Sequence, residues 1–142
     1  MSMSRRTVGQ TASAGYQIGV RRTLPAGSER IWSFLTSPAG LKLWLGEVPP
    51  LALQAGEAFT ARNGLSGEFR VVKLGEQLRL RWQKPDWPAP STLQIRLLPA
   101  GEGRTTVSFH QEKLDHAGTR EAMKQVWENV LDEMKKELTK DE

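Results

Sequence analysis

The sequence contains no cysteine, which excludes disulfide bonds, thiolate metal ligands and cysteine nucleophiles. It has only two histidines, His110 and His116, and no convergent set of further ligands accompanies them. Because a metal site needs three or four converging ligands, we expect no metal ion. No motif in the sequence indicates another cofactor.

Long apolar runs are missing as well. No stretch approaches the roughly 20 apolar residues that a bilayer-spanning helix requires, so we expect no contact with a membrane. Residues 1–15 include Arg5 and Arg6, but the apolar segment of a signal peptide does not follow them. We therefore expect a flexible N-terminal tail over residues 1–15 and a cytoplasmic location.

The length of the chain limits the number of domains, and its net charge limits the class of partner. A chain of 142 residues fits one domain, which we place at residues 16–142. We expect the protein to be a monomer or a homodimer. The net charge of +4 is too small to indicate nucleic-acid binding by itself.

The clearest pattern is an amphipathic run over residues 118–138. Its apolar residues recur three and four positions apart, which places them on one face of an α-helix. This face carries Met123, Val126, Trp127, Val130, Leu131, Met134 and Leu138. Because the opposite face is charged, the apolar face must pack against another layer.

The preceding sequence predicts that layer to be a sheet. Alternation predicts a first strand over residues 16–23, and two short helices follow, the second beginning at Pro38 after Ser37 as N-cap. Five antiparallel strands come next, over residues 57–62, 68–74, 77–84, 91–98 and 104–112. In the second of these five strands we expect Phe69 and Val71 to face inward together. The sequence thus predicts an α+β fold in which a curved antiparallel sheet surrounds a long C-terminal helix.

Five segments carry a resemblance to a known family. They are residues 30–38 with Leu41 and Trp44, residues 54–59, residues 78–82, residues 103–110, and Trp127 with Leu131. In this order they resemble the activator of heat-shock-protein-90 ATPase homologue family of the START-like, or SRPBCC, superfamily. The resemblance implies the helix-grip fold, with a cavity between helix and sheet in many members. That family often has glycine before the helix tryptophan, so Val126 implies a narrower cavity here.

Aromatic and methionine side chains on the inward faces are the candidates for lining such a cavity. They are Trp44, Phe59, Phe69, Trp82, Phe109, Met123, Trp127 and Leu131. The same spacing is typical of a packed core, and the resemblance favours the cavity. We expect Trp87, in a loop with three prolines, and His116 at the cavity mouth. The leading hypothesis is non-enzymatic binding of a small, mainly hydrophobic molecule.

Two other functions stay open. A chaperone-linked or other protein-interaction module would use either the outer face of the sheet or the loop of Trp87, rather than a cavity. That face is expected to carry Arg21, Arg70, Arg79, Arg81 and Arg96. Few exposed aromatics accompany these arginines, so we do not expect a nucleic-acid partner.

A polyketide cyclase-like or aromatase-like enzyme is the third hypothesis. It would need polar groups that point into the cavity, and the alternation of the strands provides almost none. The loop residues Glu47, Asp86, Asp115 and His116 are not spaced as a nucleophile with its base and orienting group. No catalytic residue is therefore assigned.

Overall fold

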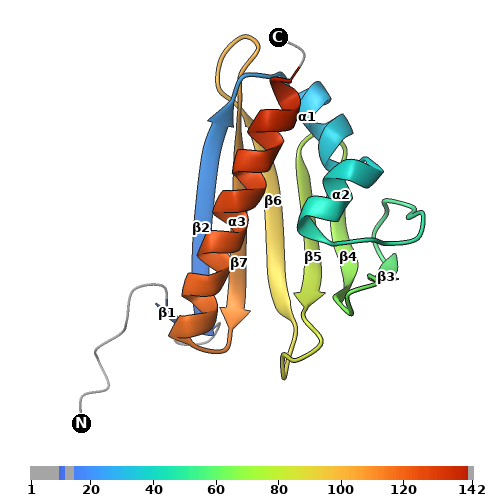
Figure 1. The fold of residues 1–142 in the computed structure, drawn as a ribbon, viewed down its shortest axis with the longest axis vertical. Coiled ribbons are helices and arrows are strands. Elements are labelled where there is room, and N and C mark those ends of the chain that lie inside the picture. Colours follow the sequence, from blue (N-terminus) through green and yellow to red (C-terminus); the bar gives the residue numbers. More distant parts are fainter. Residues whose placement is uncertain (1–9, 12–14, 141–142) are drawn as a thin grey trace.

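The computed structural model describes residues 10–11 and 15–140 (Figure 1). Its strands are β1 (Gln10–Thr11), β2 (Gly15–Leu24), β3 (Ala58–Thr60), β4 (Ser66–Lys73), β5 (Gln77–Gln83), β6 (Ser91–Pro99) and β7 (Thr105–Leu114). They form one antiparallel sheet in the order β1-β2-β7-β6-β5-β4-β3. β3 to β7 follow one another as a meander, and β2 joins the meander beside β7.

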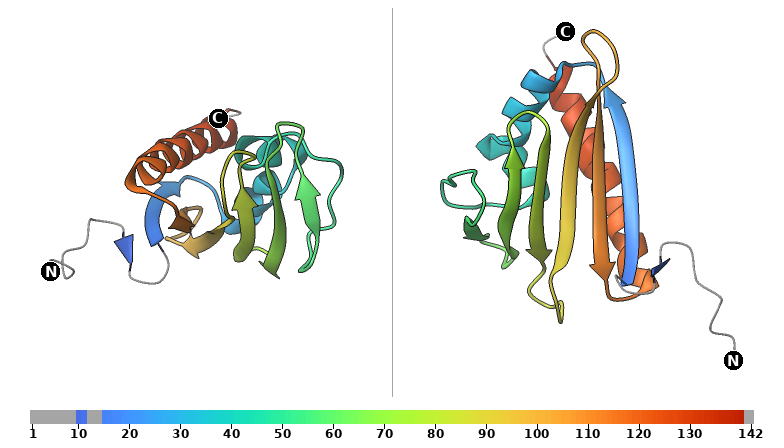
Figure 2. Two further views of the ribbon diagram at one scale, coloured as in Figure 1. Left: turned by 90° about the horizontal axis from the view of Figure 1, so that it is seen from below. Right: turned by 180° about the vertical axis from the view of Figure 1, so that it is seen from behind.

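Three helices form the second layer. They are α1 (Ser28–Leu35), α2 (Pro38–Trp44) and α3 (Ala117–Leu138). All three lie on the same side of the curved sheet, with α3 over β2 and β7 and α2 toward β4 and β5 (Figures 1 and 2). The α+β helix-grip fold is therefore confirmed.

The N-terminal segment differs from the expected tail. Gln10 and Thr11 pair with Tyr16 and Gly15 at the edge of the sheet, so a short strand precedes the first strand that the alternation predicts. The rest of residues 1–14 lies outside the described residues. The alternation could not reveal β1, because two residues are too few to show a period.

The junction of α1 and α2 is tightly packed. The Ser37 hydroxyl accepts a hydrogen bond from the Gly40 amide at 3.1 Å, which is the N-cap that the sequence predicts. A Cβ atom at position 40 would lie only 1.9 Å from the Phe34 carbonyl oxygen. Only glycine permits this approach, which directs α2 across the end of the sheet.

α3 is attached along its whole length. Near its start the Arg120 Nε donates to the Gln17 carbonyl at 2.9 Å, and near its middle Asp132 pairs with Arg22 of β2. At its end the Leu138 carbonyl accepts from Arg30 of α1 at 2.7 Å. The apolar stripe is buried apart from Val126, which is half-buried.

The expected inward position of Val71 is wrong. A register shift lies between Phe69 and Val71, where Phe69 pairs with Leu80 but Val71 pairs with Arg79. Because one extra residue exchanges the two faces of a strand, Val71 lies on the outer face and Val72 packs against the core.

None of the described helices combines the length and the apolarity of a membrane span.

Candidate functional site

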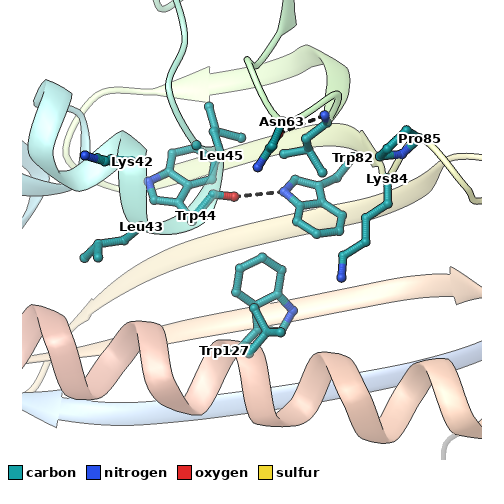
Figure 3. Close-up of a pocket in the computed structure, with 12 residues that line it drawn as sticks. Lys42, Leu43, Trp44, Leu45, Asn63, Trp82, Lys84, Pro85 and Trp127 are labelled. Atoms are coloured by element: carbon teal, nitrogen blue, oxygen red, sulfur yellow. Dashed lines mark hydrogen bonds between the residues drawn. The ribbon is translucent and has the colours of Figure 1, made fainter.

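A pocket of about 220 Å³ lies where α2, the start of the β5–β6 loop and α3 meet (Figure 3). Its lining comprises Lys42, Leu43, Trp44, Leu45, Gly46, Asn63, Leu65, Trp82, Lys84, Pro85, Val126 and Trp127. We call it the tryptophan pocket after Trp44, Trp82 and Trp127. It lies between the helical layer and the sheet, where the sequence analysis expects a cavity.

Hydrogen bonds hold the three indoles of the pocket in place. Trp44 donates its Nε1 proton to the Leu35 carbonyl at 3.1 Å, and Trp82 donates to the Trp44 carbonyl at 3.0 Å. Trp127 donates to the Gln111 Oε1 atom at 2.8 Å. The rings of Trp82 and Trp127 also meet edge to face, with centroids 5.3 Å apart. The walls of the pocket are therefore preorganised.

A buried polar chain supports Trp127 from the sheet. Gln111 is fully buried, and its Nε2 donates to the Ser91 hydroxyl at 2.9 Å. Ser91 in turn donates to the Trp82 carbonyl at 2.6 Å. Gln111 shares the parity of Phe109, so the alternation contained this signal, although the sequence analysis did not select the residue. In the described part of the chain, the buried polar side chains are Ser91, Thr105 and Gln111, none of which titrates.

Three of the eight candidate lining residues meet at the tryptophan pocket, namely Trp44, Trp82 and Trp127. The other five, Phe59, Phe69, Phe109, Met123 and Leu131, are buried in the core that surrounds it. Phe109 stacks on Trp127 with centroids 5.0 Å apart, and Phe69 lies edge to face with Trp44 at 6.4 Å. These rings support the pocket walls from behind.

The two residues expected at the mouth occupy different positions. Trp87 is half-buried and packs on Trp82 with centroids 5.4 Å apart, while its carbonyl accepts from Gln83 Nε2 at 2.9 Å. It lies behind a pocket wall. His116 is the N-cap of α3, where its Nδ1 accepts from the Thr119 amide at 3.3 Å, and it does not contribute to the pocket lining.

Two of the three carboxylates considered for catalysis, Glu47 and Asp115, have other partners. Glu47 faces Lys42 at 3.8 Å and Arg62 at 3.5 Å. The Asp115 carboxylate accepts from the Thr119 hydroxyl at 2.6 Å, and this hydrogen bond lowers the pKa of Asp115 below its usual value of 3.8. Within residues 10–11 and 15–140, no three histidine, aspartate or glutamate side chains gather closely enough to hold a metal ion.

Polar residues at the rim are the part of the site that the sequence analysis missed. Lys42, Lys84 and Asn63 all contribute to the lining, and no carboxylate does. These residues come from a helix and two loops, which approach one another only in the folded chain. A larger groove of about 530 Å³ lies between α2 and residues 46–51, but neither α3 nor the sheet contributes to it.

Comparison with solved structures finds the same fold in several proteins. CalU16 from Micromonospora echinospora has a TM-score of 0.75 and 21% identity, over 90% of this chain and 78% of its own. The Aha1 dimer from Colwellia psychrerythraea has a TM-score of 0.71 and 19% identity, over 84% of this chain and 93% of its own.

A third similar structure is PFC0360w, an HSP90 activator from Plasmodium falciparum. Its TM-score is 0.68 and its identity 19%, over 80% of this chain and 88% of its own. A comparison with curated protein sequences finds no match. The model of the family described as Activator of Hsp90 ATPase homolog 1-like protein matches residues 25–139, and the chain therefore belongs to this family.

Proposed function

We propose that this protein binds a small, mainly apolar molecule in the tryptophan pocket and does not alter it chemically. The observation that carries the proposal is a pocket of about 220 Å³ whose lining includes three fixed indoles. An apolar cavity of about 150 Å³ accepts benzene, so this pocket has room for a two-ring molecule. Burial of the rings would supply affinity at roughly 25 cal/mol per Å² of apolar surface.

The polar groups of the interior favour binding over catalysis. Ser91 and Gln111 are engaged with each other, with the Trp127 indole and with the Trp82 carbonyl. No buried side-chain nitrogen or oxygen in the described residues lacks a hydrogen-bond partner. An acid–base reaction needs a titratable group within reach of the substrate, and the titratable residues of the lining are Lys42 and Lys84.

The test uses 2-naphthalenemethanol as a neutral two-ring probe. Its titration is followed by NMR through the indole N–H signals of the ¹⁵N-labelled protein. We expect the Trp82 and Trp127 signals to shift saturably, with a dissociation constant of the order of 0.1 mM for a ligand of this size. The Trp32 signal should stay unchanged, because Trp32 does not line the pocket.

A variant that fills the pocket provides the control. Val126 is half-buried and lines the pocket, so Val126→Phe should occupy the free volume and abolish the shifts while the protein stays folded. Gln125→Phe places the same side chain on the exposed neighbouring position and should leave binding intact. No saturable shift in the wild-type protein, or undiminished binding to Val126→Phe, would refute the proposal.

A protein partner with an acidic surface is the second candidate. Arg21, Arg79, Arg81 and Arg96 are exposed and form no ion pair within the described residues, whereas Arg70 faces Glu68 at 3.6 Å. Since one similar structure is an HSP90 activator, the assay is the ATPase rate of Hsp90. Stimulation that is lost in Arg79→Glu/Arg81→Glu, and retained in Lys73→Glu, would support this role. Absence of stimulation by the wild-type protein would refute this second candidate function.

The oligomeric state bears on this second candidate, since another similar structure is an Aha1 dimer. We expect a monomer or a homodimer, and light scattering on the purified protein distinguishes the two.

A further inference from the structure

The rim of the tryptophan pocket has charge of one sign. Its lining includes Lys42 and Lys84 and no aspartate or glutamate. Lys42 is neutralised in part by Glu47, whose Oε1 lies 3.8 Å from the lysine Nζ. Lys84 has no such partner: its ammonium group forms neither an ion pair nor a hydrogen bond within the described residues. The pocket therefore presents one uncompensated positive charge.

The position of Lys84 relates this charge to the interior of the pocket. The residue is half-buried and follows β5 directly, two positions after Trp82. Figure 3 shows its side chain extending from the start of the β5–β6 loop toward Trp127, whereas Lys42 points away from the pocket. Because the lining holds no carboxylate that offsets this ammonium group, an incoming anion would meet an uncompensated positive charge.

Asn63 supplies a second donor at the same rim. Its Oδ1 accepts from the Leu65 amide at 3.0 Å, which fixes the orientation of the side chain. Its Nδ2 lies beside Gly46 and donates no hydrogen bond within the described residues. A Cβ atom at position 46, where φ is +102°, would come within 2.9 Å of this nitrogen. Glycine at this position therefore avoids a steric clash with the Asn63 amide.

We propose that the ligand of the tryptophan pocket is a planar, two-ring aromatic molecule that carries one carboxylate. The rings occupy the pocket beside Trp82, and the carboxylate accepts from Lys84 Nζ at its rim. This inference rests on the proposed function and narrows it to an acidic ligand. A carboxylate suits the lysine because a hydrogen bond between an ammonium group and a carboxylate is strengthened by both charges.

The test compares two probes that share a ring system and differ in charge, 2-naphthoate and 2-naphthalenemethanol. Calorimetric titration at neutral pH should show that the wild-type protein binds 2-naphthoate roughly tenfold or more tightly than the alcohol. Lys84→Met keeps the apolar stem and removes the charge, so it should abolish the preference for 2-naphthoate over the alcohol. Lys84→Arg should retain the preference.

Two further variants distinguish the effect of a charge at the pocket rim from the effect of the net charge of the protein. Lys73→Met removes the same charge from the far end of the β4–β5 hairpin, roughly 20 Å away, and should keep the preference. Asn63→Asp keeps the acceptor for the Leu65 amide but faces the ligand with a like charge, so it should weaken 2-naphthoate binding and not alcohol binding.

The outcomes distinguish the two proposals. Three results would overturn the proposal of an acidic ligand and leave the proposed binding function standing. They are equal affinity of the wild-type protein for both probes, tighter binding of the alcohol, and a preference that survives Lys84→Met. Binding of neither probe would overturn both.

Discussion

The hydrogen bond between Trp127 and Gln111 offers a quantitative test of how the pocket wall is held. Trp127 has no exposed surface, stacks on Phe109, and donates to Gln111 Oε1 at 2.8 Å. Trp127→Phe removes the donor and leaves the buried Gln111 oxygen without a partner. Gln111→Leu does the reverse and leaves the indole N–H without an acceptor.

The magnitudes follow from burial. An unpaired buried polar group costs about 1–3 kcal/mol. Trp127→Phe also leaves a void of roughly 40 Å³, worth about 1 kcal/mol at ~24 cal/mol per Å³. We therefore expect Trp127→Phe to lower the free energy of unfolding by about 2–4 kcal/mol and Gln111→Leu by about 1–3 kcal/mol.

The double variant is the informative one. Trp127→Phe/Gln111→Leu removes both partners and avoids both unpaired-group costs, so its loss should fall short of the sum of the single losses by about 2–6 kcal/mol. Far-ultraviolet circular dichroism during urea denaturation measures all three variants without relying on Trp127 fluorescence. With a urea slope of ~2 kcal/mol per M, a loss of 3 kcal/mol lowers the midpoint by about 1.5 M.

Trp32→Phe is the matched control for this cycle. Trp32 is half-buried and its indole nitrogen donates no hydrogen bond within the described residues, so we expect a loss below about 1 kcal/mol. Losses that add to within about 0.5 kcal/mol in the double variant would refute the coupling. A wall that is not held by this bond would also weaken the argument for a preorganised pocket.

Three further predictions concern pocket size, acid stability and a helix cap. Val126→Ala should enlarge the pocket and raise the affinity for a three-ring probe relative to a two-ring probe, measured by calorimetry; an unchanged ratio would contradict this. The Arg22 hydrogen bond lowers the pKa of Asp132 below 3.8, so its stabilising contribution is present above pH 3.8 and disappears as the pH falls through the folded-state pKa. Denaturation midpoints of Asp132→Asn should lie below those of the wild type at neutral pH and converge with them in acid; a gap that persists would exclude the linkage. Gly27 caps α1 without a side-chain hydrogen bond and has open space around it, so Gly27→Ser should add about 0.5–1 kcal/mol, visible as a higher melting temperature.

The sequence could predict the fold because its periodic patterns are long. The α3 stripe continues for about six turns and the strands from β2 onward alternate clearly, so few arrangements bury all of the apolar faces. The error at Val71 has a local cause. A bulge shifts the phase of alternation by one residue, and the residue types on either side of it do not reveal the shift in the sequence.

The site was less predictable than the fold. The sequence could identify Trp44, Trp82 and Trp127 as inward-facing residues, but periodicity does not separate rings that line a void from rings such as Phe109 that fill the core. Lys84 and Asn63 lie in loops, where no period applies. Their place in one pocket lining depends on how the loops around β4 and β5 meet α2, which is a property of the folded chain.

The central claim is that the pocket whose lining includes Trp44, Trp82 and Trp127 admits a small aromatic molecule. Intermolecular nuclear Overhauser effects between 2-naphthalenemethanol and the labelled protein measure this directly. We expect cross-peaks from the probe to the ring protons of Trp82 and Trp127 and to the Val126 methyl groups. Cross-peaks confined to the groove of residues 46–51, or none at saturating probe, would contradict the account.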